Sequence, residues 1–268
     1  MIVDGKHIAD MLVAELARER TSLPKKVTLG VLLGKEDAAS ASFVRIKERR
    51  AEELEVALMR YEVSPEMTTE VLLQTLPDFL EQVEGVIVQL PLPPHIDGEQ
   101  VLRAVPAEKD VDGLNQRISP FVEAPVAAAI REILKRTGVS VAGKQAVVLG
   151  AGRLVGKPAA EMLRNLGAIV SVVTESEGSL MDIQQADVLV LGAGKPAVVK
   201  PDMLKPGVVL LDAGTSEMQG KLAGDADPAC AQVASVFTPV PGGIGPVAVA
   251  MIFKNLFTLL RKKNPPTA

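Results

Sequence analysis

Short apolar runs alternate with helix-like segments along nearly the whole chain, and this alternation limits the possible folds more than any other feature. Most runs are continuously apolar, which is typical of strands buried on both faces of a parallel sheet. The alternation therefore predicts an α/β fold with a mostly parallel sheet and helices on both faces. We expect strands at 27–33, 56–63, 85–90, 145–149, 168–173, 187–191 and 208–212, and helices at 8–23, 41–54, 68–83, 98–105, 125–137, 156–166 and 247–262.

The βα pattern restarts near residue 140, after a turn-rich stretch at 106–113. A chain of 268 residues is long enough for one large domain or two of moderate size. The restart favours two α/β units.

Composition excludes several classes of protein. The net charge is −4 and aromatic residues make up 3%, so the basic, aromatic surface typical of a nucleic-acid binder is missing. The single cysteine, Cys230, forms no internal disulfide, which fits a reducing compartment. His7 and His95 lack metal-ligand spacing, so we expect no metal. The N-terminus does not resemble a signal peptide, and the apolar stretch at 240–253 is too short to span a bilayer. We therefore expect a cytoplasmic protein with no membrane partner.

A glycine-rich turn connects the predicted strand 145–149 to the helix that follows it. Gly150, Gly152 and Gly156 form the pattern G-x-G-x-x-x-G, a variant of the dinucleotide-binding fingerprint. Glycines let the backbone approach a pyrophosphate, and the helix N-terminus supplies N–H groups. A tight turn that binds nothing is the alternative. Glu175 and Glu177 follow the next strand, where an acidic side chain either contacts a ribose hydroxyl or lies in a solvated loop.

Three polar residues of the first unit are candidates for chemistry. Lys47 lies on a highly charged predicted helix, where a solvated face is the alternative. Gln89 ends an apolar strand, at the edge where α/β sheets bind ligands, although a locally satisfied glutamine is also possible. Asp112 precedes Gly113, and Asp-Gly is also an ordinary turn signal.

These residues belong to strings that together resemble the methylenetetrahydrofolate dehydrogenase/cyclohydrolase family of the bacterial FolD type. The strings are VDGK at 3–6, FVRIK at 43–47, VQLPLP at 88–93, KDVDG at 109–113, VGKP at 155–158, ADVLV at 186–190 with GKP at 194–196, and TPVPGGIGP at 238–246. They are long, specific and spread in order along nearly the whole chain.

The resemblance implies two lobes with a cleft between them. Residues 1–117 would form an N-terminal α/β folate-binding lobe, completed by a C-terminal helix at 247–268. Residues 118–246 would form a Rossmann-like, parallel-sheet lobe that binds NADP or NAD, and members of the family usually pair as homodimers through this lobe. The implied folate-binding residues are Phe43, Gln89, Leu90, Pro91, Asp112, Pro241, Gly242 and Gly243. The cofactor residues are Gly150, Gly152, Arg153, Leu154, Val155, Gly156, Thr174, Glu175, Gly194 and Thr215.

The implied reaction has two steps in one-carbon metabolism. Hydride passes from methylenetetrahydrofolate to the nicotinamide, and water then converts the methenyl cation into formyltetrahydrofolate. Lys47 is the candidate base of the second step, because a desolvated lysine can lose its proton near neutral pH. Gln89 is expected to hydrogen-bond Lys47, Asp112 to accept two N–H bonds from the pterin, and Phe43 to stack beside it.

The chain departs from the family pattern at three places. Phe43 replaces a tyrosine, which removes a hydroxyl next to Lys47 and affects the hydrolytic step more than folate binding. The segment 114–125 is shorter than usual, so its substrate contacts are not carried over. Glu175 and Glu177 replace polar residues of the family and would repel the extra phosphate of NADP, whereas Arg153 would attract it.

Three hypotheses follow from these departures. The first is the bifunctional enzyme. The second, motivated by Phe43, is a dehydrogenase with weak or lost cyclohydrolase activity. The third is a non-catalytic folate-binding homologue, motivated by the short loop and the altered cofactor strand. The presence of Lys47, Gln89 and Asp112 together argues against the third.

Overall fold

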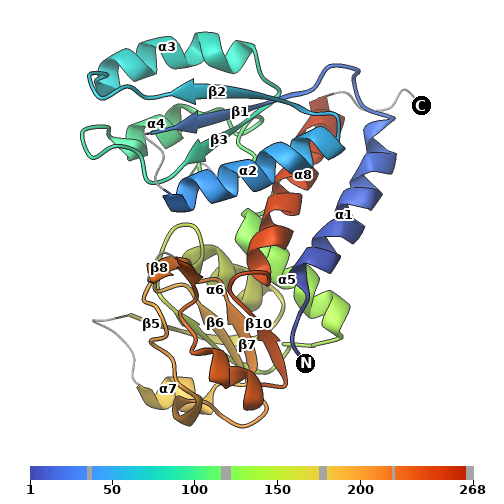
Figure 1. Ribbon diagram of the computed structural model, residues 1–268, viewed down its shortest axis with the longest axis vertical. Coiled ribbons are helices and arrows are strands. Elements are labelled where there is room, and N and C mark those ends of the chain that lie inside the picture. The colour runs from blue at the N-terminus through green and yellow to red at the C-terminus, as the bar shows by residue number, and fades with distance from the viewer. Residues whose placement is uncertain (35–37, 116–121, 175–179, 219–220, 264–268) are drawn as a thin grey trace. The chain divides into compact units, whose positions relative to one another are not determined.

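A computed structural model describes residues 1–34, 38–115, 122–174, 180–218 and 221–263, with the backbone alone for residues 38–43 and 180. The chain divides into two compact units (Figure 1). Unit 1 comprises Met1–Asp10 and Val126–Ala248, and unit 2 comprises Met11–Pro125 and Val249–Ala268. Each unit contains a parallel sheet, which confirms the predicted α/β fold class.

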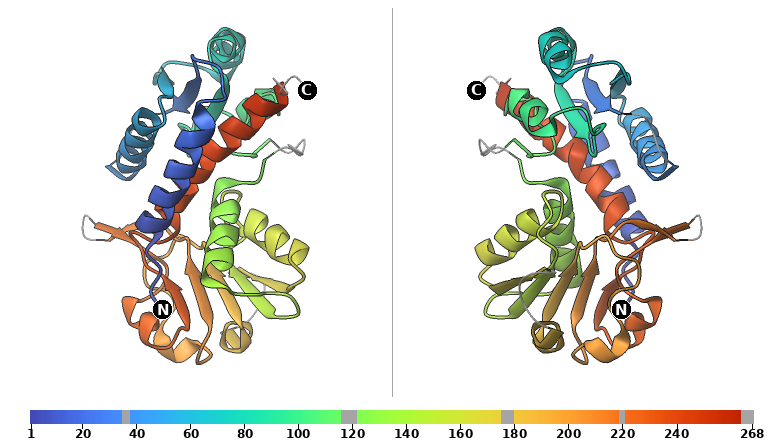
Figure 2. Two further views of the ribbon diagram at one scale, coloured as in Figure 1. Left: turned by 90° about the vertical axis from the view of Figure 1, so that its right-hand side faces the viewer. Right: turned by 90° about the vertical axis from the view of Figure 1, so that its left-hand side faces the viewer.

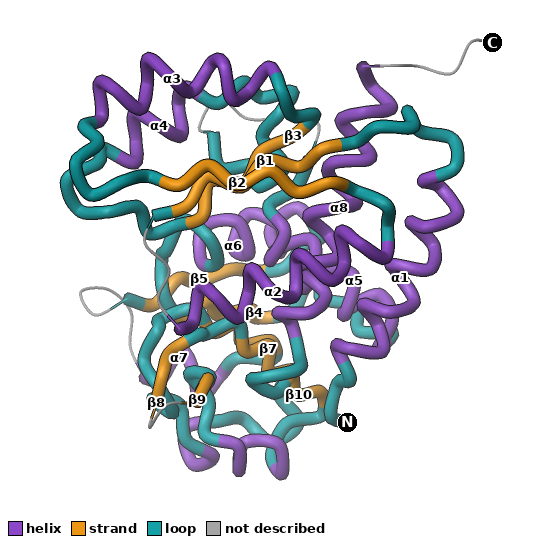
Figure 3. Tube along the Cα trace, turned by 45° about the horizontal axis from the view of Figure 1, so that its top comes forward, coloured by secondary structure: helices purple, strands orange, loops and turns teal. Residues whose placement is uncertain are grey.

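Unit 2 is built on a three-stranded parallel sheet of order β2–β1–β3. The strands are β1 (Thr28–Leu33), β2 (Ala57–Glu62) and β3 (Gly85–Gln89). Helices α3 (Thr69–Glu81) and α4 (Gly98–Ala104) cover one face of this sheet (Figure 3). Leu32, Leu76 and Val101 belong to the hydrophobic cluster that joins them.

The opposite face of the same sheet is covered by α2 (Ala38–Glu53) and α8 (Ile244–Lys263) (Figure 1). Helix α1 (Gly5–Arg20) lies beside α8 (Figure 2), where Arg261 pairs with Glu19.

Helix α1 begins three residues before the expected start at residue 8. The Asp4 carboxylate accepts a hydrogen bond from the His7 amide at 3.0 Å. The Asp4 carbonyl also accepts from the Ile8 amide. These bonds satisfy N–H groups of the first turn and fix the earlier start.

Helix α8 also begins earlier than predicted and is 20 residues long. Among the residues described, it is the one helix whose length and composition would let it cross a membrane. Helix α8 therefore continues to Lys263, beyond the apolar stretch at 240–253 that we judged too short to span a bilayer. However, 72% of its apolar window is buried inside the protein, as in the core helix of a globular fold.

Unit 1 contains a five-stranded parallel sheet of order β10–β7–β6–β4–β5. The strands are β4 (Gln145–Leu149), β5 (Ile169–Val173), β6 (Val188–Leu191), β7 (Val209–Asp212) and β10 (Val236–Thr238). Its helices are α5 (Pro125–Thr137), α6 (Gly156–Asn165) and α7 (Leu180–Gln185), and β8 (Ser216–Met218) pairs with β9 (Lys221–Ala223) as a hairpin. Strand β10 was not predicted, because three residues are too few to form a recognisable apolar pattern.

The N-terminal segment belongs to unit 1, whereas we expected residues 1–117 to form one lobe. Ile2 makes a parallel bridge to Phe237, the middle residue of β10. The Val3 amide donates to the Phe237 carbonyl at 2.8 Å, and the Phe237 amide donates to the Met1 carbonyl at 2.9 Å. The chain therefore begins as an addition to the edge of the five-stranded sheet.

The strand order of unit 1 reverses at β4. Strand β5 lies on one side of β4, and the chain then crosses to β6 on the other side. Loops that follow such strands diverge, and in open α/β sheets ligands bind at this topological switch point. The glycine turn follows β4, so it lies at that position.

Candidate active site

Lys47 and Gln89 form a hydrogen-bonded pair in unit 2. The Lys47 ammonium donates to Gln89 Oε1 at 2.7 Å, which confirms the predicted hydrogen bond. Lys47 is only 6% exposed, so the alternative of a solvated face is wrong. Helix α2 directs the lysine inward, and the end of β3 supplies the amide.

Asp112 faces this lysine. The pKa of Asp112 is raised to about 7, mainly by burial; the Lys47 ammonium lowers this pKa and the nearby Asp110 carboxylate raises it. The pKa of Lys47 is in turn lowered by burial, against the attraction of Asp112. The two groups therefore exchange protons more readily near neutral pH than an exposed lysine and aspartate would.

The backbone around Asp112 is held from two sides. The Asp110 carboxylate accepts from the Asp112 amide at 3.1 Å and from the Asn115 amide at 2.7 Å. Asn255 on α8 donates its Nδ2 to the Val111 carbonyl at 2.8 Å. Gly113 has a φ of 62°, which suits a glycine in this turn. Asp112 is therefore both a turn residue and a fixed acidic group.

The other residues expected beside folate lie on different elements. Leu90 is half-buried and Pro91 exposed after β3, and their peptide bond is cis. Phe43 lies in α2, but its side chain is outside the described residues.

Pro241, Gly242 and Gly243 follow β10 in unit 1. The Gly5 amide donates to the Gly242 carbonyl at 2.9 Å. A Cβ on Gly5 would lie 1.8 Å from the Gly243 carbonyl oxygen, so only glycine permits this approach. The VDGK string at 3–6 is thus packed against the TPVPGGIGP string at 238–246, although the two strings lie near opposite ends of the sequence.

The glycine turn of unit 1 is sterically determined at two of its three glycines. A Cβ at Gly156 would lie 2.0 Å from the Gly150 carbonyl oxygen, and one at Gly150 would lie 2.4 Å from the Gly192 carbonyl oxygen. Gly152 has no neighbouring atom within 4 Å of such a Cβ. Gly150 and Gly156 therefore hold the turn together, while Gly152 leaves open space at the N-terminus of α6 for a ligand such as a pyrophosphate.

The remaining residues expected at the dinucleotide lie on loops at one edge of the sheet. Parallel strands present their carboxyl ends at the same edge, and these loops follow β4, β5, β6 and β7. Glu175 and Glu177 are outside the described residues. The residues described at this edge are Gly150, Gly152, Arg153, Leu154, Val155 and Gly156 after β4, Thr174 after β5, Gly194 after β6 and Thr215 after β7.

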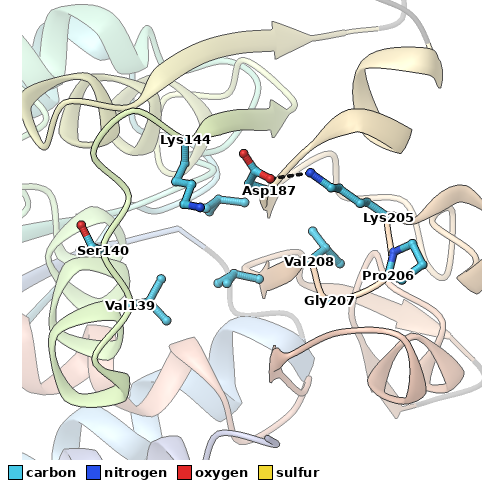
Figure 4. A pocket seen from close by; sticks show the side chains of 10 residues that line it. Val139, Ser140, Lys144, Asp187, Lys205, Pro206, Gly207 and Val208 are labelled. Atoms are coloured by element: carbon cyan, nitrogen blue, oxygen red, sulfur yellow. Dashed lines mark hydrogen bonds and ion pairs between the residues drawn. The ribbon is translucent and has the colours of Figure 1, made fainter.

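A shallow depression lies at the opposite, amino edge of the same sheet (Figure 4). Its lining includes Ser140, Lys144 and Asp187, and the Asp187 carboxylate is paired with Lys205 at 2.6 Å. None of the expected site residues lines it. Because ligands of open α/β sheets bind at the carboxyl edge, we assign no role in the reaction to this depression.

Two buried carboxylates of unit 1 were missed by sequence analysis. Asp212 and Asp225 are 1% and 0% exposed, and both accept hydrogen bonds from loop amides. Asp212 ends an apolar strand, as Gln89 does, so the same signal would have identified it. Asp225 gives no such signal, because the amides it binds lie 30 to 32 positions away in sequence.

Metal-binding clusters were searched for in the part of the chain that the structure describes. No group of three or more His, Cys, Asp or Glu side chains is arranged there to hold a metal ion.

A glycine turn at the switch point of one parallel sheet, together with a buried lysine held by an amide and faced by a carboxylate, defines a dinucleotide-dependent α/β enzyme. Comparison with protein families agrees. The model for the tetrahydrofolate dehydrogenase/cyclohydrolase catalytic domain matches residues 3–112, and that for the NAD(P)-binding domain of the same proteins matches residues 124–264. The chain belongs to the tetrahydrofolate dehydrogenase/cyclohydrolase family, which confirms the resemblance seen in the sequence.

Individual relatives cover nearly the whole chain. The bifunctional protein FolD of Halothermothrix orenii is 38% identical over 270 residues, which are 95% of each chain. The crystal structure of FolD methylenetetrahydrofolate dehydrogenase/cyclohydrolase from Campylobacter jejuni is 31% identical, with a TM-score of 0.92, and covers 98% of this chain and 99% of that one. The Trypanosoma brucei FolD structure, complexed with NADP cofactor and inhibitor, is 31% identical, with a TM-score of 0.91, covering 99% and 98%.

Proposed function

We propose that this chain, an NAD(P)-dependent methylenetetrahydrofolate dehydrogenase and methenyltetrahydrofolate cyclohydrolase, carries out the hydrolytic step with Lys47. The observation that carries the assignment is the buried Lys47–Gln89 pair facing Asp112. A lysine whose pKa is lowered by burial can take a proton from attacking water and return it during ring opening. Gln89 accepts from Lys47 and so holds its nitrogen in one orientation.

Asp112 is proposed to hold the amino-pyrimidine edge of the pterin. Its ionised carboxylate can accept two parallel N–H bonds from such an edge. In the free protein the raised pKa leaves Asp112 only partly ionised near neutral pH. Donors on the substrate would stabilise the ionised form, and the negative charge would then favour the protonated form of Lys47. We propose that Phe43 stacks beside the pterin and that Leu90 and Pro91 line the remainder of the folate site in unit 2. For Pro241, Gly242 and Gly243, a role in substrate binding is proposed on the family resemblance alone.

A variant of Lys47 tests the hydrolytic assignment. Lys47→Met keeps an unbranched side chain but removes the amine, so cyclohydrolase turnover should fall by about 10²- to 10⁴-fold. The dehydrogenase rate should fall much less. Arg49→Met on the same helix is the matched control, because Arg49 is exposed and pairs only with Glu53 in the structure described. Full cyclohydrolase turnover by Lys47→Met would remove the assignment.

The dinucleotide is proposed to lie on the glycine turn, with its pyrophosphate over Gly152 and the N-terminus of α6. The open space at Gly152 and the closely packed Gly150 and Gly156 fit this group. When bound, the nicotinamide ring supplies the hydride acceptor. We propose that the reaction uses no metal, so that chelator treatment leaves both activities unchanged.

The choice between NAD and NADP is proposed to depend on Arg153 and Glu175. An arginine favours the extra phosphate of NADP, and a glutamate after the second strand favours the ribose hydroxyl of NAD. The family default is NADP, whereas Glu175 and Glu177 argue for NAD. Measuring kcat/KM with each dinucleotide decides the preference. Arg153→Ala should reduce NADP use selectively, and Glu175→Ser should improve it; equal effects on both dinucleotides would refute these roles.

We also propose that the chain acts in the cytoplasm as a homodimer paired through the Rossmann unit, without nucleic-acid or membrane partners. Strand β5 lies at the edge of the sheet, and its residue Ile169 is 55% exposed. Edge strands with exposed apolar side chains favour pairing with another chain. Ile169→Glu should therefore shift a dimer toward monomer in sedimentation measurements. A wild-type monomer at micromolar concentration would contradict the proposal.

A further inference from the structure

The loop that follows β6 is held by one buried carboxylate. Asp225 Oδ2 accepts from the Ala193 amide at 2.6 Å and the Gly194 amide at 3.1 Å, and Oδ1 accepts from the Lys195 amide at 2.7 Å. Three consecutive peptide N–H groups therefore converge on a side chain that is fully buried. Hydrogen bonds to an ionised acceptor are about twice as strong as neutral ones, so the loop has little freedom to rearrange.

A second carboxylate fixes Asp225 itself. Asp212, the last residue of β7, accepts from the Asp225 amide at 3.2 Å and the Ala226 amide at 2.8 Å. A Cβ on Gly214 would lie 2.3 Å from the Asp225 carboxyl carbon, and one on Gly224 would lie 2.2 Å from Asp212 Oδ2. Each carboxylate therefore packs directly against a glycine, and the loops after β6 and β7 are held in one arrangement.

This arrangement adjoins the glycine turn. A Cβ on Gly192 would lie 2.5 Å from the Val155 side chain, and a Cβ on Gly150 would lie 2.4 Å from the Gly192 carbonyl oxygen. Any shift of the loop after β6 would therefore displace the turn. Gly194, the middle residue bound by Asp225, is exposed and has a φ of 68°.

We propose that Asp225 is a positioning residue of the dinucleotide site, which holds Ala193–Lys195 in the conformation that receives the dinucleotide. The proposal rests on the proposed function, in which the dinucleotide occupies the carboxyl edge of this sheet. Asp225 acts through the loop amides and is not proposed to touch the ligand. It therefore affects dinucleotide binding, but neither folate binding nor the hydrolytic step.

The near-isosteric variant Asp225→Asn tests the proposal. The side-chain NH₂ of the asparagine replaces one carboxylate oxygen and opposes at least one loop N–H. The KM for the dinucleotide should therefore rise by about tenfold or more, which is the size expected for losing a hydrogen bond to a charged acceptor. The kcat at saturating dinucleotide, the KM for folate and the cyclohydrolase rate should stay close to wild type. Asp227→Asn is the matched control, because its carboxylate binds the Ala229 amide and Lys200 instead of the loop.

Two results would overturn the proposal alone. One is an unchanged dinucleotide KM in Asp225→Asn, while the wild-type protein binds dinucleotide. The other is a parallel loss of dinucleotide binding, folate binding and cyclohydrolase rate in a folded variant, which indicates a general structural role. Absence of NAD and NADP binding by the wild-type protein would instead overturn the proposed function, and this inference with it.

Hydrogen exchange in the wild-type protein decides the matter if Asp225→Asn fails to fold. The amides of Ala193, Gly194 and Lys195 should be protected without ligand and should exchange more slowly still with saturating dinucleotide. Amides of the loop Asp227–Ala229 serve as the control region. No change at residues 193–195 on dinucleotide binding would overturn the proposal.

Discussion

Replacing Asp112 by asparagine should stabilise the folded protein at alkaline pH while weakening folate binding. Burial raises the pKa of this carboxyl from 3.8 to about 7. In the unfolded chain the carboxyl has its ordinary pKa of 3.8, whereas in the folded protein its pKa is about 7. Between these two pH values the folded state therefore binds more protons than the unfolded state. The contribution of Asp112 to stability is therefore present below the unfolded pKa and is lost as the pH rises through the folded pKa.

The size of this effect follows from the same two values. Each tenfold change in proton affinity corresponds to ~1.4 kcal/mol, which gives about 4 kcal/mol as an upper limit. Asp112 is half-buried, so solvent reaches part of it. Solvent therefore reduces the effect to about 2 kcal/mol, because screening weakens the penalty on the ionised form.

Urea unfolding measured at several pH values provides the assay. The stability difference between Asp112→Asn and wild type should be small at about pH 4 and should grow to about 2 kcal/mol in favour of the variant by about pH 8. Asp78→Asn on the exposed surface of α3 is the control for loss of one negative charge. A difference that stays constant or shrinks as the pH rises would refute the reasoning.

Three further predictions follow from the geometry. Gly152→Ala should keep wild-type stability but weaken dinucleotide binding. Gly156→Ala should weaken binding and also lower the melting temperature, because its Cβ would lie 2.0 Å from the Gly150 carbonyl oxygen. Equal melting temperatures of the two variants would contradict this prediction. Asn255→Leu removes the donor to the Val111 and Glu123 carbonyls, so chemical unfolding should show a loss of about 1–3 kcal/mol in the free energy of unfolding. The KM for folate should rise as well, and an unchanged folate KM would contradict the view that Asn255 supports Asp112. Because Asp112 raises the pKa of Lys47, Asp112→Asn should move the rising limb of the cyclohydrolase pH profile to lower pH at saturating folate, and a move to higher pH would contradict Lys47 as the base.

The strands were predictable because buried parallel strands leave continuous apolar runs. The ranges 145–149 and 85–90 agree with β4 and β3 to within one residue. The glycine turn was also predictable, because the strand before it and the helix after it are adjacent in the sequence.

Other parts of the site were not predictable from local patterns. The burial of Lys47 was hidden because α2 carries many charged residues, and only the fold shows which of them faces Gln89. Asp225 binds amides about 30 residues away, and Asn255 binds Val111 across 144 positions. Such contacts depend on tertiary structure, which one sequence does not reveal.

The central claim is that one chain performs both the oxidation and the hydrolysis. The direct test is to mix the purified protein with methylenetetrahydrofolate and NAD or NADP and to follow reduced dinucleotide and methenyltetrahydrofolate by absorbance. We predict that reduced dinucleotide accumulates with at least one cofactor while the methenyl compound stays low, because Lys47 promotes its hydrolysis. Methenyltetrahydrofolate accumulating in step with the reduced dinucleotide would contradict the account, as would the absence of reduction with either cofactor.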